Sequence, residues 1–248
     1  MEIIERHDNG RVRTRAAVVD GKLHGDSLSY DEEERLTHKA SYADGLLDGE
    51  SIVFRETGKP AARSTFKAGQ LHGETCAYDE EGRIAQRMQF ARGKLHGEML
   101  SYQDGVVRTR MTFAEGKQQG PFVAYDEDGR ETARMTYRDG KLNGDAVFLD
   151  GKGKPLRKAT YRDNKLHGEV SEHHLNGQVR ERGVYKDGKK DGEWRSFSED
   201  GRLLSKSHFK AGELRGAPIE YDERGQPKPA GEGKKSVLST IAGKLTGG

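Results

Sequence analysis

The feature that constrains this chain most is a glycine that returns at intervals of 24 residues, each time as the second glycine of a motif such as Gly-Lys-Leu-His-Gly-Glu. We call these residues the repeat glycines: Gly25, Gly49, Gly73, Gly97, Gly120, Gly144, Gly168, Gly192 and Gly216. One interval, from Gly97 to Gly120, is a residue shorter. Self-similarity at a fixed period of this length is typical of repeat proteins, in which one supersecondary unit stacks on the next.

A second series of glycines runs about half a repeat out of step with the first. Its members are Gly10, Gly58, Gly82, Gly105, Gly129, Gly153, Gly177, Gly201 and Gly225, and Glu34 interrupts it. Glycine adopts positive φ at no steric cost, so we expect both series to mark places such as hairpin turns. The segments between them are short and rich in aromatic and β-branched residues, which indicates strands. We therefore predict an all-β, elongated, single-layer array of antiparallel hairpins, about nine units of 24 residues, over residues 1–225.

An aromatic residue stands seven positions before each repeat glycine after the first. This aromatic stripe consists of Tyr42, Phe66, Phe90, Phe113, Tyr137, Tyr161, Tyr185 and Phe209. A leucine usually stands two positions before the repeat glycine, and a second aromatic series follows five positions after it. We expect all three series to share one face of the array. Only 32% of the residues are hydrophobic, which suits a narrow seam between neighbouring units better than a thick core.

The repeated Gly-Lys-Leu-His-Gly-Glu, the aromatic that follows it, Asp-Glu-x-Gly-Arg, and the Tyr or Phe before the next glycine resemble MORN repeats. The resemblance covers residues 1–225 and is closest to the variant found in bacterial antitoxin and immunity-type proteins. It implies a cytoplasmic protein that acts by binding. Its partner would be a cognate toxin or a secreted effector, for example one of type VI secretion. The alternative that the family implies is a membrane-associated scaffold that binds lipid and organises other proteins.

Four residues depart from the repeated pattern. Asn164 and Glu34 replace turn glycines, and Gln118 and Lys190 replace the leucine. Each departure marks either a local irregularity or a contact site.

The sequence gives no constellation for catalysis, a cofactor or a metal, and we expect a protein that is not an enzyme. The histidines of the Leu-His-Gly motifs are His24, His72, His96 and His167. Equivalent residues of successive hairpins lie roughly 10 Å apart, whereas zinc ligands lie about 2 Å from one ion, so we expect these histidines to flank turns. The single cysteine, Cys76, stands where other units have Leu, Ile or Val, and we expect a buried hydrophobic residue.

Charge and hydropathy remove other classes of protein. A net charge of +2 argues against an electrostatic nucleic-acid binder. No apolar run is long enough for a transmembrane helix, and the first residues do not read as a secretory signal, so we expect a cytoplasmic location.

Partner contacts are expected where the repeat changes toward apolar residues. Two and four positions after the repeat glycine most residues are small or polar, but the middle and C-terminal units have Met99, Phe122, Phe148, Val170 and Trp194. We expect these positions to face away from the residues three and five positions after the glycine. They form either a partner surface, where tryptophan is enriched, or additional packing.

The last residues, 226–248, differ from the repeats. They read as a flexible basic linker followed by a short amphipathic segment, with Val237, Leu238, Ile241, Ala242 and Leu245 on one helical face. Four alternatives are open for this segment: it folds over the open edge of the last hairpin, it is disordered, it docks into a partner, or it touches a membrane surface.

Overall fold

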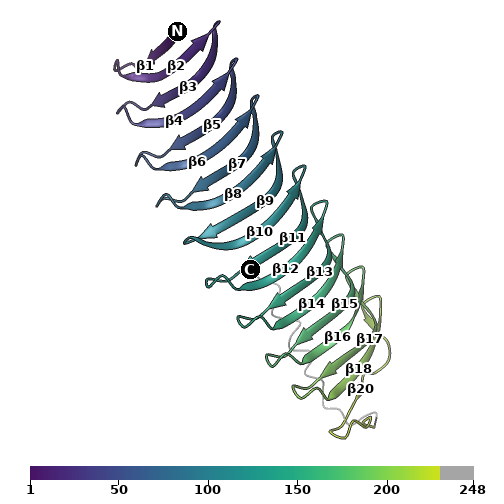
Figure 1. Cartoon of the computed structure of the whole chain (residues 1–248). Helices are drawn as coiled ribbons and strands as arrows, with labels where there is room; N and C mark the ends of the chain where they lie inside the picture. The colour runs from purple at the N-terminus through teal and green to yellow at the C-terminus, as the bar shows by residue number, and fades with distance from the viewer. Residues whose placement is uncertain (230–248) are drawn as a thin grey trace. The chain divides into compact units, whose positions relative to one another are not determined.

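The computed structural model describes residues 1–229, and this part of the chain is all-β, with no helix among these residues. Its twenty antiparallel strands form hairpin repeats of an open sheet, as the glycine series predicts (Figure 1). The chain divides into two units, Met1–Gly144 and Asp145 onward, which we describe separately.

The first unit contains twelve complete strands, each antiparallel to the next along the chain. They are β1 (Glu2–Arg6), β2 (Val12–Val19), β3 (Lys22–Tyr30), β4 (Leu36–Ala43), β5 (Leu46–Phe54), β6 (Pro60–Lys67), β7 (Gln70–Tyr78), β8 (Ile84–Ala91), β9 (Lys94–Gln103), β10 (Val106–Ala114), β11 (Lys117–Tyr125) and β12 (Glu131–Arg138). The next strand, β13 (Lys141–Leu149), starts in the first unit and ends in the second.

The second unit continues with the same alternation. Its strands are β14 (Pro155–Arg162), β15 (Lys165–His173), β16 (Val179–Lys186), β17 (Lys189–Phe197), β18 (Leu203–Lys210), β19 (Glu213–Leu214) and β20 (Ile219–Glu220). The two short strands both pair with β18. Beyond β20, Pro227 forms a bridge with Tyr221. The expected amphipathic segment of the tail lies outside the described residues.

A two-residue turn stands at the start of each motif. It consists of the residue before the motif and the first residue of the motif, and both have positive φ. Asp44 (φ 50°) and Gly45 (φ 83°) join β4 to β5, and this conformation matches the twist of the strands it connects. The backbone N–H of Gly45 also donates to the carbonyl of Leu23, at 2.8 Å, in the preceding motif. The same bond recurs in later repeats, so successive turns are tied together along one edge of the sheet.

Two of the departures from the pattern keep this backbone conformation. Glu34 has φ 65° and Asn164 has φ 66°, so each adopts the positive φ of the glycine that it replaces. They change the side chain at a turn without changing the path of the chain.

The repeat glycines do have positive φ, but those from Gly25 to Gly192 lie inside strands and not in turns, which corrects our expectation; Gly216 lies between β19 and β20. Around Gly49, Ala40 pairs with Ser51 while Tyr42 pairs with Leu47. Three residues of β5 thus stand opposite one residue of β4, which is a β-bulge. In this bulge the backbone of residue 49 has φ 113°. An L-residue with a side chain rarely adopts this conformation, which explains why the residue is glycine.

Residues of the aromatic stripe lie directly across from repeat glycines, namely Tyr42, Phe66, Phe90, Phe113, Tyr137, Tyr185 and Phe209. Tyr42 pairs with Gly25 on one neighbouring strand and with Leu47 on the other. The same face carries Ser51, two positions after the next repeat glycine, and Ser51 is buried. We call this the aromatic face. It holds the core of the second unit and part of the buried residues of the first, in which Cys76, Leu100 and Val123 are buried on the opposite face.

The second aromatic series does not join the aromatic face, which corrects the expectation of one stripe. Phe197 lies under the guanidinium of Arg182, 5.4 Å from its ring centroid. Arg182 is adjacent along its strand to Gly183, which pairs with Val170 on the aromatic face, so Arg182 and Phe197 lie on the opposite face. The physical reason is the odd spacing between leucine and second aromatic, because side chains of a strand alternate between faces.

Replacing a repeat glycine is expected to destabilise the sheet. At Gly168 (φ 114°) an added Cβ lies 3.2 Å from the Cβ of Thr160, so Gly168→Ala combines backbone strain with a close contact. We expect a loss of about 1–3 kcal/mol in the free energy of unfolding, measured with urea. Gly151, which has no neighbour within 4 Å of an added Cβ, is the control. Equal losses for Gly151→Ala and Gly168→Ala would contradict the bulge argument.

Candidate functional site

The five residues expected at a partner surface lie on the aromatic face. Val170 and Trp194 are buried, with 3% and 4% of their surface exposed, and form the core of the second unit together with Ala159. Met99, Phe122 and Phe148 are half-buried. For Val170 and Trp194 the structure shows the packing role; contact of any of the five with a partner stays a prediction.

Met99 and Phe122 belong to a row of flexible side chains that crosses the first unit. Met88 pairs with Met99, Met99 with Met111, and Met111 with Phe122. Phe122 then pairs with Met135. The row fills positions that are serine, threonine or alanine in earlier repeats, so it thickens the apolar seam in this part of the aromatic face.

Trp194 belongs to the hydrophobic core cluster of the second unit. Its ring meets the edge of Tyr185 at 5.2 Å and that of Phe209 at 6.3 Å between centroids. The indole N–H donates to the carbonyl of Val184 at 3.2 Å. Burial in this cluster raises the pKa of Tyr185. A large aromatic group at this position therefore has its polar atom satisfied and its ring enclosed.

Two neighbours explain how the sheet accommodates this tryptophan. A Cβ at Gly183 would lie 2.3 Å from the ring, so only glycine fits beneath it. Lys190, in the leucine position, places its ammonium 3.7 Å from the ring centroid and 3.2 Å from a carboxylate oxygen of Glu181. The departure at Lys190 is thus a cation–π contact that covers Trp194. Gln118, the other departure, pairs with Phe113, and its amide nitrogen is buried without a hydrogen-bond partner in the described structure.

Gly183 and Trp194 are expected to be energetically coupled. Gly183→Ala forces the Cβ into the indole ring and should lower the free energy of unfolding by about 1–3 kcal/mol. In a Trp194→Val background the same change should cost less than about 0.5 kcal/mol, because the ring is gone. Urea titration followed by circular dichroism measures both, and Ser207→Ala, at the equivalent position one repeat later, is the control. Equal effects of Gly183→Ala in the two backgrounds would show that the ring is not the cause.

The opposite face carries a feature that the sequence analysis missed. Ten positions before every repeat glycine stands a basic residue: Arg15, Lys39, Arg63, Arg87, Arg110, Arg134, Lys158, Arg182 and Lys206. The spacing to the repeat glycine, applied to charged as well as apolar residues, would have found them. In the structure they form one cross-strand row in each unit.

In the first unit an apolar residue separates each basic residue of the row from the next. Arg63 pairs with Cys76, Cys76 with Arg87, and Arg87 with Leu100. Cys76 is buried, as expected, and desolvation together with the nearby Glu74 raises the pKa of its thiol.

Acidic residues directly after the repeat glycines neutralise this row. The ion pairs are Lys39–Asp26 at 3.4 Å, Arg87–Glu74 at 3.8 Å, Arg110–Glu98 at 3.2 Å, and Arg63–Glu50. The first unit therefore has a row of cations that are both separated and paired.

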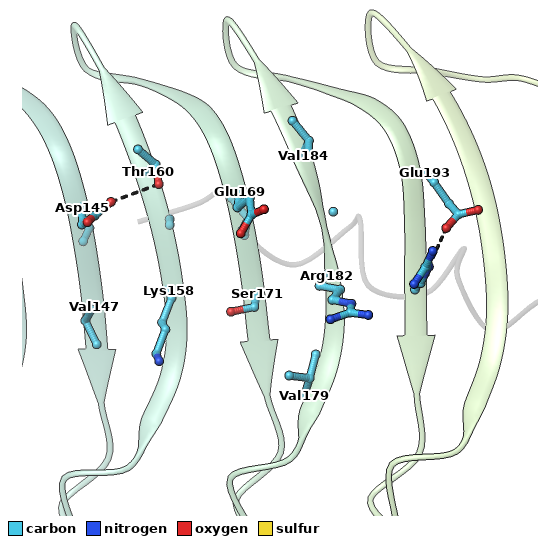
Figure 2. A pocket seen from close by; sticks show the side chains of 15 residues that line it. Asp145, Val147, Lys158, Thr160, Glu169, Ser171, Val179, Arg182, Val184 and Glu193 are labelled. Atoms are coloured by element: carbon cyan, nitrogen blue, oxygen red, sulfur yellow. Dashed lines mark hydrogen bonds and ion pairs between the residues drawn. The ribbon is translucent and has the colours of Figure 1, made fainter.

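In the second unit the separating residues change. Lys158 pairs with Ser171, Ser171 with Arg182, Arg182 with Arg195, and Arg195 with Lys206. We call Lys158, Arg182, Arg195 and Lys206 the cation row. Lys158, Ser171 and Arg182 lie at the same level on three neighbouring strands (Figure 2).

The cation row borders a concave region of about 770 Å³ on strands β13 to β17. Asp145, which also lines it, is hydrogen-bonded to the hydroxyl of Thr160 at 3.1 Å (Figure 2). A hydrogen bond from Arg195 lowers the pKa of Glu193, which remains ionised at neutral pH. Valine side chains, among them Val179 and Val184, complete the lining. We call this region the groove.

The turn histidines lie beside acidic residues of the next turn. The Nδ1 atoms of His24, His96 and His167 are 3.8, 3.6 and 3.2 Å from carboxylate oxygens of Asp44, Glu115 and Asp187. Among residues 1–229, no group of three or more His, Cys, Asp or Glu residues is arranged to hold a metal ion. The same range contains no helix, and therefore no helix in it that could cross a membrane.

Comparison with known proteins bears on the repeats. The family model described as a MORN repeat variant matches residues 166–187 and 190–211. These stretches are two successive repeats of the second unit, and they are similar to the MORN repeat variant. The other units carry the same glycine and aromatic positions. No curated protein matches the chain.

Solved structures resemble the chain only distantly. A mutant of S. aureus TarM in complex with Fondaparinux, alpha-GlcNAc-glycerol and UDP is 10% identical, with a TM-score of 0.24, over 50% of this chain and 20% of that one. The Photorhabdus luminescens Tc holotoxin pore is 12% identical, with a TM-score of 0.23, over 89% of this chain and 14% of that one. This chain thus spans a small part of either structure, and likenesses at this level carry no argument about function.

Proposed function

We propose that this chain is a non-catalytic, protein-binding repeat protein that neutralises a cognate bacterial toxin or secreted effector by covering its active site or substrate path. The observation that carries the proposal is that the two faces of the sheet in the second unit differ in structure. The aromatic face holds the core, while the opposite face of the second unit presents a groove with exposed charged side chains.

The residues that line the groove suit the binding of a partner better than catalysis. Its hydroxyl groups are Thr160 and Ser171, and Thr160 is already hydrogen-bonded to Asp145. The groove's lining includes neither histidine nor cysteine. A nucleophile needs an adjacent base and a group to orient that base. Asp145 lies beside the Thr160 hydroxyl, but in the described structure it forms no further hydrogen bond or ion pair that would orient it.

The construction of the sheet also suits tight binding. A backbone that is held by cross-strand pairing and by packed aromatic residues on the reverse side loses little freedom when a partner docks. The sheet backbone beneath the groove is fixed by its hydrogen-bond ladders, so a partner meets a surface that is already formed.

Co-expression tests the proposed role. We expect the chain to restore growth of cells that express the toxic product of a neighbouring gene, and to form a complex with it of Kd below about 1 μM. Calorimetry on the purified pair measures the affinity. Absence of both rescue and complex formation would refute the role. Binding to anionic liposomes in place of a protein would favour the lipid-bound scaffold.

A further inference from the structure

We propose that the cation row and groove of the second unit bind an extended acidic segment of a partner protein, whose carboxylates pair with Lys158 and Arg182. This inference deepens the proposed function and rests on it for the nature of the partner. It is carried by three observations on the second unit: adjacent cations, cations without ion pairs, and a groove beside them.

Adjacent cations are the first observation. Arg182, Arg195 and Lys206 occupy directly opposed positions on β16, β17 and β18. Like charges directly opposite each other destabilise an antiparallel pair. The first unit avoids this arrangement by placing Leu, Ile, Cys or Val between its basic residues, so the same fold does not require it. A costly arrangement that the fold does not need is a sign of a binding role.

The lack of internal partners is the second observation. Glu193 serves both Arg195, by a hydrogen bond, and Lys206, at 4.0 Å. Within the described structure, Lys158 and Arg182 form no ion pair, and both side chains are exposed. The equivalent Arg87 of the first unit is paired with Glu74. The guanidinium of Arg182 instead lies over the ring of Phe197. A guanidinium can bind a carboxylate through two parallel N–H···O bonds.

The residues that line the groove indicate which class of anion fits it. Its lining includes Glu169, which has no ion pair in the described structure, as well as Val147, Val179 and Val184. A continuous polyphosphate would meet the carboxylate of Glu169 and these apolar walls. A peptide segment places carboxylates opposite Lys158 and Arg182 and keeps neutral or apolar side chains at Glu169 and the valines. Glu169 thus acts against polyanions and fixes the register of the segment.

The spacing fits an extended segment laid across the strands. Neighbouring strands are about 4.8 Å apart, so Lys158 and Arg182, two strands apart, are separated by roughly 10 Å. Side chains on one side of an extended peptide recur about every 7 Å. The long, flexible lysine and arginine side chains span the remaining difference.

The test uses the full chain and a fluorescein-labelled 14-residue peptide of alternating glutamate and valine, with fluorescence anisotropy as the readout at low salt. We expect Arg182→Gln to weaken binding at least about tenfold, which corresponds to ~1.4 kcal/mol. The matched control Arg87→Gln, in the first unit, should change it less than about twofold. A second variant, Arg195→Val, restores an apolar separator and should also weaken binding. All variants are compared by urea unfolding to show that they are folded.

Other outcomes overturn the inference. Failure of the parent chain to bind the peptide, or equal weakening by Arg87→Gln and Arg182→Gln, would show that the cation row is not a specific site. Tighter binding of phosphatidylserine vesicles or duplex DNA, with the same dependence on Arg182, would show that the class of partner is wrong.

Growth rescue separates this inference from the proposed function. If the parent chain rescues growth and Arg182→Gln rescues equally well, the inference fails and the function stands. If the peptide binds through Arg182 but the parent chain rescues nothing, the toxin-neutralising role fails and the acidic-segment site stands.

Discussion

The structure depends on one contact that is repeated along the chain: an aromatic ring placed directly across from a glycine with positive φ. The glycine creates a bulge in one strand, and the ring on the next strand covers the backbone that the missing side chain exposes. Rings such as Tyr42 and Phe66 also pair with the leucine of the following strand, and Phe113 and Tyr185 pair with Gln118 and Lys190 in the same position, so each ring connects its strand to both neighbours. A thin sheet is stable in this way with few apolar residues.

In the second unit the core lies on the aromatic face, which leaves the other face available for charge. In the first unit this face is neutralised internally, since cations alternate with apolar residues and pair with the carboxylates that follow the repeat glycines. In the second unit Ser171 and Arg195 replace two separators, and the pairing is incomplete. The core there is correspondingly reinforced by Trp194, which requires Gly183 beneath it. Strong packing on one face and unpaired charge on the other occur in the same strands.

The repeat period was sufficient to predict the hairpin architecture, because a glycine recurring at one place in the sequence recurs at one place in the backbone. The position of each glycine was less predictable. Positive φ is common to turns and bulges, so Gly45 and Gly49 look alike in the sequence although one lies in a turn and the other inside a strand. For Trp194 the sequence left a partner surface and additional packing as alternatives, and in the structure it packs in the core.

The sequence by itself determined the class of fold, the number and length of the units and the residues that form the aromatic stripe, since these follow from local periodicity. Only the tertiary structure decided which series share a face and which residues are neighbours across strands. Lys158, Arg182 and Lys206 are 24 residues apart in sequence, and Arg195 lies between the last two. Their alignment into one row is set by the register of the hydrogen-bonded ladders, which the bulges shift and which no single strand contains.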